Sequence, residues 1–224
     1  MKHLKRIPVL VLLLVCFLCF ADPNAARAAT VVTSLSAFTA DLAPGYYLET
    51  FSGLTGGGTT LPVSIPFTGG TGNAFSYNAV DDSGQGLFAL PLFGTPSELS
   101  TSFFGATVQF DFLSGNVAAV GGSFFSTDTE GDPDDGTITV NLSDGTHATI
   151  PTSSLSSFVG FLSPGVFITN LDVVPGADSY ATVANFYVGG YAAPVGSVPE
   201  PATFGLLAGG LIAGGLLRKR LSRV

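Results

Sequence analysis

Five acidic side chains within eight residues form the densest group of chemistry-bearing residues in the sequence. They are Asp128, Glu130, Asp132, Asp134 and Asp135. Carboxylate oxygens at alternating positions suit Ca²⁺, which prefers several hard oxygen ligands. The spacing departs from an EF-hand loop, because Pro133 and Thr139 stand at the sixth and twelfth positions counted from Asp128, where that loop needs Gly and Glu. The segment therefore predicts either a calcium site or the solvated tip of a hairpin.

Catalytic motifs are sparse elsewhere in the chain. A Ser-His-Asp triad would have to use His147, the only histidine apart from His3, and the sequence has no Gly-x-Ser-x-Gly, Walker or His-Glu-x-x-His pattern. Two carboxylates facing each other across a cleft could hydrolyse a glycoside, but sequence spacing does not give their separation. We expect no catalytic residues and no enzymatic activity, with a glycan hydrolase as a distant alternative.

Tyrosine side chains offer a different chemistry, the binding of sugars. Tyr46, Tyr47, Tyr77 and Tyr191 would stack on sugar rings if they were exposed, as aromatic residues of lectin-like sandwiches do. Packing in the core is the other interpretation of each ring. A calcium-dependent, lectin-like carbohydrate-binding module is therefore the main alternative function.

The distribution of charge narrows the choice of partners. The chain of 224 residues has 16 acidic and 8 basic residues and a net charge of −8. No Lys or Arg occurs between Ala28 and Val198. A region this anionic repels phosphate backbones, so we expect no nucleic-acid partner. Its carboxylates have no Lys or Arg to pair with, which is why Ca²⁺ is the one cofactor considered.

The first 28 residues have the pattern of a secretory signal peptide. Basic residues precede an apolar run, Ile7–Phe20, and Ala26 and Ala28 form an A-x-A cleavage site. We expect cleavage after Ala28. Both cysteines, Cys16 and Cys19, lie inside the segment that would be removed. The mature protein is therefore expected to have no disulfide and no thiolate.

The C-terminal segment, residues 198–224, has three parts. These are the motif Val198, Pro199, Glu200 and Pro201, the apolar stretch 202–217, and the basic cluster Arg218, Lys219 and Arg220. The apolar stretch predicts a transmembrane helix, and the basic residues after it predict a cytoplasmic end. The rest of the chain would then face outward. A permanent membrane anchor is the simpler alternative to a processed tail.

These three parts, in this order, resemble the PEP-CTERM sorting tail of Gram-negative bacteria. The resemblance implies an exosortase, a membrane cysteine transpeptidase, as the partner that processes the chain at or near Pro199-Glu200-Pro201. It also implies insertion in the inner membrane before processing, and delivery to the cell envelope, the cell surface or the extracellular matrix. A role in biofilm, with exopolysaccharide as a further partner, belongs to the same set of implications.

Residues 29–197 contain short aromatic and β-branched runs separated by Gly, Pro, Asn and Asp, which is typical of an all-β domain. We expect an antiparallel β-sandwich of the jelly-roll type, with Phe side chains filling the space between its sheets. The turn signals predict three hairpins, over 107–125, 137–150 and 158–174. One short helix is expected within 33–42.

The segment 180–191 is expected to form the last strand of this domain, in which successive side chains alternate between the two faces of the sheet. It would place Ala181, Val183, Asn185 and Tyr187 on one face of the sheet. The hairpin segments of the domain also resemble, loosely, the body domain of PEP-CTERM proteins.

The sequence thus predicts a signal peptide over 1–28, a β-sandwich body over 29–197 and a sorting tail over 198–224. The function predicted is that of a secreted, exosortase-processed structural protein of the cell surface or extracellular matrix. The lectin-like module and the hydrolase are the alternatives.

Overall fold

The computed structural model of the chain describes residues 28–54, 60–91, 97–152 and 157–192. The chain divides into two units, Met1–Tyr191 and Ala192–Val224. The body is the part of the first unit from Ala29 onward. Residues 1–27 of the predicted signal peptide and the whole predicted sorting tail lie outside the described residues. Within the described ranges no helix is both long and apolar enough to cross a membrane.

The described part of the body contains one short helix and a long series of β-strands, with turns rich in Gly between them. The elements are β1 (Thr30–Val32), α2 (Leu35–Ala40), β2 (Tyr47–Glu49), β3 (Ser64–Gly69), β4 (Phe75–Asp81), β5 (Leu87–Leu90), β6 (Glu98–Thr101), β7 (Val108–Phe112), β8 (Ala119–Thr127), β9 (Gly136–Leu142), β10 (His147–Thr152), β11 (Phe158–Leu162), β12 (Asn170–Val174) and β13 (Tyr180–Gly189). The prediction of an all-β domain is confirmed.

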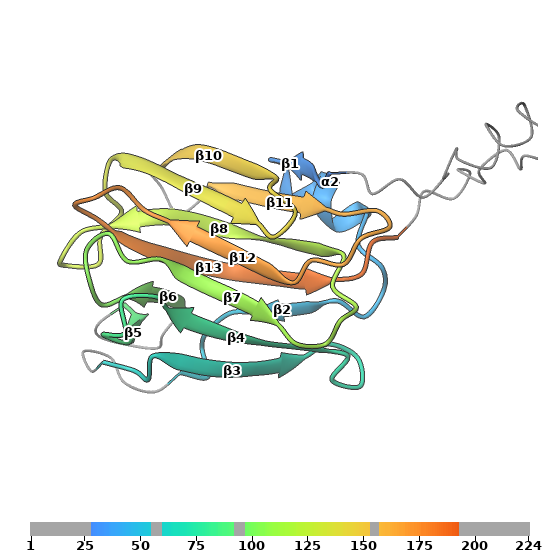
Figure 1. Ribbon diagram of the computed structural model, residues 1–224, viewed down its shortest axis with the longest axis horizontal. Helices are drawn as coiled ribbons and strands as arrows, with labels where there is room; N and C mark the ends of the chain where they lie inside the picture. Colours follow the sequence, from blue (N-terminus) through green and yellow to red (C-terminus); the bar gives the residue numbers. More distant parts are fainter. Residues whose placement is uncertain (1–27, 55–59, 92–96, 153–156, 193–224) are drawn as a thin grey trace, which may run out of the picture. The chain divides into compact units, whose positions relative to one another are not determined.

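Two antiparallel sheets face each other (Figure 1). The first has the strand order β1-β11-β8-β13-β6-β5, with β2 also paired to β13, and the second has the order β10-β9-β12-β7-β4-β3. Pro66 lies in β3, which is an edge strand, where a missing N–H costs no ladder hydrogen bond.

The connections between β6 and β13 cross from sheet to sheet, except for the turn between β9 and β10. These eight strands form one quartet, β6-β13-β8-β11, and a second, β7-β12-β9-β10. A double sheet wound in this way has the connectivity of a jelly roll.

One of the three predicted hairpins forms. Strands β9 and β10 pair directly, with His147 opposite Asn141. The other two predictions, 107–125 and 158–174, are wrong, because β7 and β12 belong to the second sheet whereas β8 and β11 belong to the first. The turns after β7 and β11 carry the chain across the sandwich instead of reversing it within one sheet.

Aromatic rings fill the space between the sheets, as expected from the many Phe residues. The second sheet contributes Phe67, Phe75, Tyr77, Phe110 and Phe112, and the first contributes Phe124, Phe161 and Phe186. Each ring buries a large apolar surface, and edge-to-face or offset contacts between rings add to that stabilisation.

A β-bulge interrupts β13. Ala184 pairs with Ser123 and Tyr187 pairs with Gly121, so two residues, Asn185 and Phe186, stand opposite Gly122 alone. Asn185 has a φ of 48°, the left-handed conformation that Asn tolerates better than most residues.

The bulge reverses the faces of β13 beyond Ala184. Phe186 is fully buried in the core between the sheets, whereas Asn185 is exposed and Tyr187 packs on the opposite, outer face. The predicted alternation is therefore correct for Ala181 and Val183 and wrong from Asn185 onward. An extra residue in a strand shifts every later side chain to the other face.

Helix α2 packs on the outer face of the first sheet, within the range predicted for it. The Ser34 side chain caps its N-terminus by accepting a hydrogen bond from the N–H of Ala37 at 3.4 Å. Phe38, which is fully buried, lies over Gly121 and Gly160, a directly paired couple on β8 and β11. A Cβ at Gly160 would overlap the Phe38 ring.

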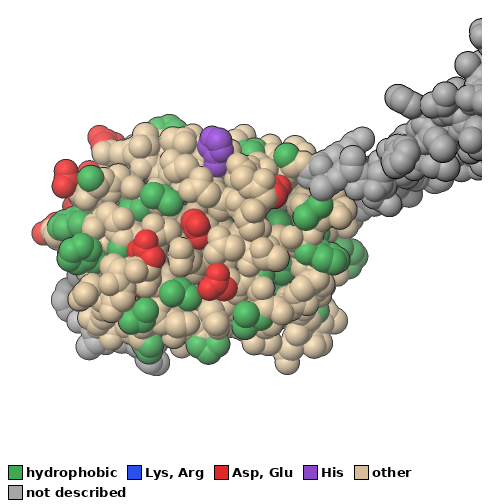
Figure 2. All heavy atoms as spheres, viewed as in Figure 1, with side chains coloured by type: hydrophobic (Ala, Val, Ile, Leu, Met, Phe, Trp, Pro, Cys, Tyr) green, Lys and Arg blue, Asp and Glu red, His purple; other side chains and the backbone are tan. Residues whose placement is uncertain are grey.

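Different segments of the chain lie at the two ends of the sandwich (Figure 1). At one end, Thr30 pairs with Leu162, and Leu162 and Gly189 both pair with Ala119, so the start of β1 and the end of β13 lie at the same end of the first sheet, with β11 and β8 between them. At the other end, Tyr180 pairs with Thr127, and the acidic loop 128–135 follows. Figure 2 shows acidic side chains scattered over one face, with no Lys or Arg among the described residues.

Candidate functional site

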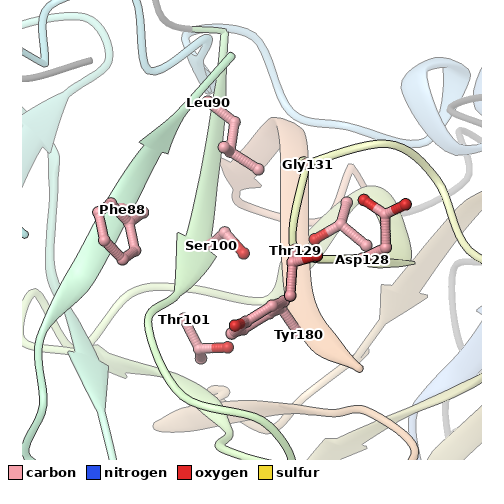
Figure 3. Close-up of a pocket in the computed structure, with 9 residues that line it drawn as sticks. Phe88, Leu90, Ser100, Thr101, Asp128, Thr129, Gly131 and Tyr180 are labelled. Carbon is pink, nitrogen blue, oxygen red and sulfur yellow. The ribbon is translucent and has the colours of Figure 1, made fainter. Parts of the chain in front are cut away.

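A groove of about 290 Å³ lies at the end of the sandwich that carries the acidic loop (Figure 3). Its lining consists of Phe88, Leu90, Ser100, Thr101, Thr127, Asp128, Thr129, Gly131 and Tyr180. Small-molecule sites in proteins begin at about this size. The groove is therefore large enough for one small ligand.

Strand alternation places a row of hydroxyl side chains at and beneath the floor of the groove. Leu99 and Val183 point into the core, so their neighbours Ser100 and Thr182 point to the outer face of the first sheet. The Thr182 hydroxyl lies 2.8 Å from that of Ser100 and 2.8 Å from that of Thr127. Three strands, β6, β13 and β8, thus contribute to one buried row of hydroxyl groups.

Aromatic and aliphatic side chains form the walls. Phe88 is half-buried on β5, and Tyr180 stands at the start of β13. The ring of Tyr180 stacks on that of Phe104, with centroids 4.3 Å apart and planes 24° from parallel. That contact restrains the Tyr180 ring at the edge of the groove.

The acidic loop forms the remaining wall (Figure 3). Asp128 Oδ1 accepts the N–H groups of Glu130 at 3.0 Å and Asp132 at 2.9 Å. The N–H of Asp134 donates to the carbonyl of Ser126 at 2.9 Å. Gly131 has a φ of 86°, which lets the loop turn back toward Leu90. The loop is closed largely by its own backbone and by the carboxylate of Asp128.

The five predicted calcium ligands share this loop but differ in exposure. Asp128 and Asp134 are half-buried, whereas Glu130, Asp132 and Asp135 are exposed. Among the described residues, no three Asp, Glu, His or Cys side chains are grouped so that they could hold a metal ion. Calcium binding by this loop stays a prediction, as does its alternative, a solvated hairpin tip.

The tyrosines considered for sugar stacking have different environments. Tyr77 is fully buried, and its hydroxyl has no hydrogen-bond partner among the described residues. Tyr47 packs against Gly69 and donates to the Glu49 carboxylate. Burial, together with that hydrogen bond and the negative charge of Glu49, raises the pKa of Tyr47. Tyr46 is 41% exposed. Packing in the core is thus the correct interpretation for Tyr77.

The other residues named in the sequence analysis are either exposed or lie outside the described ranges. His147 is exposed on β10. Ala28 is described and exposed, whereas Ala26 lies outside the described residues. The motif residues Val198, Pro199, Glu200 and Pro201 lie outside them as well.

Sequence reasoning missed the groove. Ser100 and Thr182 are 82 residues apart, and Thr127 and Thr182 are 55 apart. Nothing in the local sequence of any of them indicates that they meet. Of the residues that line the groove, only Asp128 belonged to a site predicted from the sequence, the possible calcium site.

The fold and the groove define the body as an all-β sandwich domain with a hydroxyl- and aromatic-lined surface site. The C-terminal segment carries a second, more specific signal. Residues 197–220 match the PEP-CTERM protein-sorting motif, which confirms the resemblance seen in the sequence. The motif implies export and cell-surface sorting in bacteria, with an exosortase as the processing partner. No curated protein matches the chain.

Proposed function

We propose that this chain is an exosortase-processed structural protein of the Gram-negative cell surface or extracellular matrix. The observation that carries the proposal is the sorting motif at residues 197–220. In this proposal the signal peptide starts export, the apolar stretch 202–217 holds the chain in the inner membrane, and processing near Pro199-Glu200-Pro201 ends that attachment. The body acts in biofilm or alongside exopolysaccharide through its surface and without catalysis.

The composition of the body supports a role outside the cell. It carries acidic groups and no Lys or Arg between Ala28 and Val198, so copies of the body repel one another and stay soluble. Neither cysteine lies in the body. Its stability therefore depends on the aromatic core and not on a redox state.

The proposal is tested by following the chain in a bacterium that has an exosortase and in the matching deletion strain. The triple variant Pro199→Ala, Glu200→Ala, Pro201→Ala is compared with the control Pro194→Ala, a proline upstream of the motif. We expect the wild type and the control to reach the surface or medium, and the triple variant to stay in the membrane fraction. Equal release of all three forms would contradict the proposal.

The groove favours a second candidate function, a carbohydrate-binding module. A sugar ring presents apolar C–H faces and hydroxyl edges, and the groove is lined by Phe88 and Tyr180 together with the hydroxyl of Thr129 and the carboxylate of Asp128. The absence of Lys and Arg from the body disfavours anionic ligands. In the calcium-dependent form of this candidate, the loop containing Asp128 holds the ion beside the sugar.

This candidate is tested by screening the exported protein against neutral oligosaccharides, with Ca²⁺ or with EDTA. Tyr180→Ala and Asp128→Asn should each weaken binding, whereas Phe167→Ala, a control side chain that is 58% exposed, should not. A Ca²⁺-induced rise in Tm that Asp128→Asn abolishes would support the calcium-dependent form, because binding to the folded state raises stability. Absence of binding to every oligosaccharide would contradict the candidate.

The hydrolase alternative gains no support from the groove. Among the described residues that line it, Asp128 is the only carboxylate, whereas most glycosidases use two.

A further inference from the structure

The backbone nitrogen of Ala29 makes a long-range contact. Its N–H donates to Asp144 Oδ2 at 2.9 Å and to Thr146 Oγ1 at 3.1 Å. Both acceptors belong to the turn between β9 and β10, more than a hundred residues away in sequence. Ala29 itself is only 8% exposed and is part of the core.

This contact joins the two sheets at one edge. Ala29 immediately precedes β1, the edge strand of the first sheet, and Asp144 connects β9 to β10, the edge strand of the second. The residue before it, Ala28, is exposed. The nitrogen of Ala29 is thus held on one side by acceptors and attached on the other to a residue in solvent.

The Ala28–Ala29 bond is also the predicted signal cleavage site. Because the body has no Lys or Arg, an amino group at Ala29 would be its only amine. It would form where a carboxylate already accepts a hydrogen bond from the same nitrogen.

We propose that Ala29 is the mature N-terminus and that its α-ammonium group forms an ion pair with Asp144, fastening β1 to the β9–β10 turn after export. Hydrolysis of the Ala28–Ala29 bond by a signal peptidase consumes one water. Its hydroxyl goes to the Ala28 carbonyl carbon and its hydrogen to the Ala29 nitrogen, which takes up a further proton at neutral pH. One amide donor thereby becomes a charged group with three donors.

The carboxylate is suited to this role. Burial acts to raise the pKa of Asp144, but hydrogen bonds from the backbone of Thr146 and Ala29 and from the Thr146 hydroxyl outweigh it and lower the pKa. Asp144 therefore stays ionised at neutral pH, and a charged partner strengthens such a hydrogen bond.

Few other titratable groups surround the amino group. Strand β11 and helix α2, which contact β1, contain none. Strand β10 contributes His147, which is exposed. Among the residues that the structure describes, Asp144 is the one carboxylate that accepts a hydrogen bond from the Ala29 nitrogen.

The proposal rests on export by the signal peptide, and the exported, processed protein tests it. Mass spectrometry of the purified protein should identify Ala29 as its first residue. Lys2 and Lys5 leave with the signal peptide, and Lys219 leaves with the tail in the proposed processing, so the α-amine is the one primary amine of the processed protein. Labelling with an amine-reactive reagent at neutral pH therefore reports on Ala29 directly.

Three variants separate the ion pair from general folding effects. Asp144→Asn removes the charge, Asp178→Asn is the matched control at an exposed position, and a Ser-Gly insertion between Ala28 and Ala29 moves the amine while every side chain remains. We expect the wild-type α-amine to label roughly threefold to tenfold more slowly than in Asp144→Asn, because pairing favours the charged, unreactive form. Asp144→Asn and the insertion should lower the Tm at neutral pH, and Asp178→Asn should not.

The outcomes distinguish this inference from the proposed function. An exported protein that begins at another residue would overturn the inference and leave the proposed function standing. Equal labelling and equal Tm in the wild type and Asp144→Asn would also overturn it. A chain that stays in the cell with residues 1–28 attached would overturn both.

Discussion

The ring of Phe186 stacks on the ring of Phe110 across the space between the two sheets, with centroids 4.1 Å apart and planes 21° from parallel. Phe186 also contacts Tyr77 edge to face at 5.5 Å. It reaches this position only because the bulge at Asn185 turns it inward. The β-bulge in β13 therefore places the Phe186 ring at the centre of the aromatic core.

Phe186→Ala should be strongly destabilising. The side chain is fully buried among aromatic partners, and truncating such a Phe costs about 3–5 kcal/mol of unfolding free energy. Urea unfolding of the exported protein measures this cost. Phe103→Ala is the control, since that ring is 57% exposed and its loss should change stability by about 0.5 kcal/mol or less. Similar costs for both variants would contradict the packing described.

Asn185 should accept Gly far better than Val. Its φ of 48° is open to Gly and strained for a β-branched residue. We expect Asn185→Val to lower the unfolding free energy by about 1–2 kcal/mol and Asn185→Gly to change it by about 0.5 kcal/mol or less. Because Asn185 is exposed, lost packing does not confuse the comparison. Equal stabilities of the two variants would argue against the bulge.

The sequence predicts the class of the fold much better than its connections. Alternating side chains and turn residues predict the strands. They also predict the tight β9–β10 hairpin, because its two strands are neighbours in the sequence. The turns after β7 and β11 look similar in sequence, yet they lead to the opposite sheet, because burial of the whole strand decides its partner. Asn185 gives no sign of a bulge, since its effect depends on pairing with Gly122 on another strand.

The functional features also differ in how far the sequence predicts them: contiguous motifs are predictable, and contacts between distant segments are not. The tail is a contiguous signal and was predictable from Pro199-Glu200-Pro201, the apolar stretch and the basic cluster. The hydroxyl row at the floor of the groove depends on Ser100, Thr127 and Thr182, which only the strand order brings together. The contact of Ala29 with Asp144 likewise requires the edges of both sheets to be in place.

Gly160→Ala should destabilise the outer layer of the first sheet. Its added Cβ would overlap the Phe38 ring, and overpacking of this kind costs roughly 1–3 kcal/mol. In a Phe38→Ala background the same substitution should cost much less, which a double-mutant cycle by denaturant unfolding measures. Gly53→Ala is the control, as no atom lies within 4 Å of the Cβ it would add. Additive effects of the Phe38 and Gly160 changes would contradict the contact.

Asp172→Asn should stabilise the protein at neutral pH. Burial, and then the charges of Asp111 and Asp82, raise the pKa of Asp172 despite a hydrogen bond from Asn170 that lowers it. A carboxyl group whose pKa is higher in the folded state destabilises the fold above that pKa, and this penalty disappears as the pH falls below the unfolded value. The gain in Tm should therefore be present at pH 7 and vanish near pH 3.

The comparison for this prediction is Asp178→Asn, which removes the same charge from an exposed loop position. Thermal melts across pH at low ionic strength should show a smaller gain for it. An Asp172→Asn gain that does not depend on pH would point to a cause other than ionisation.

The central claim, processing of the tail by an exosortase, is tested most directly by the mass of the mature chain from cells with and without the exosortase. Intact-mass spectrometry reads the C-terminal residue of the product. We expect the apolar stretch 202–217 and the basic cluster to be missing from the protein made with the enzyme and retained in its absence. A chain that keeps Arg218-Lys219-Arg220 in both strains would contradict the account.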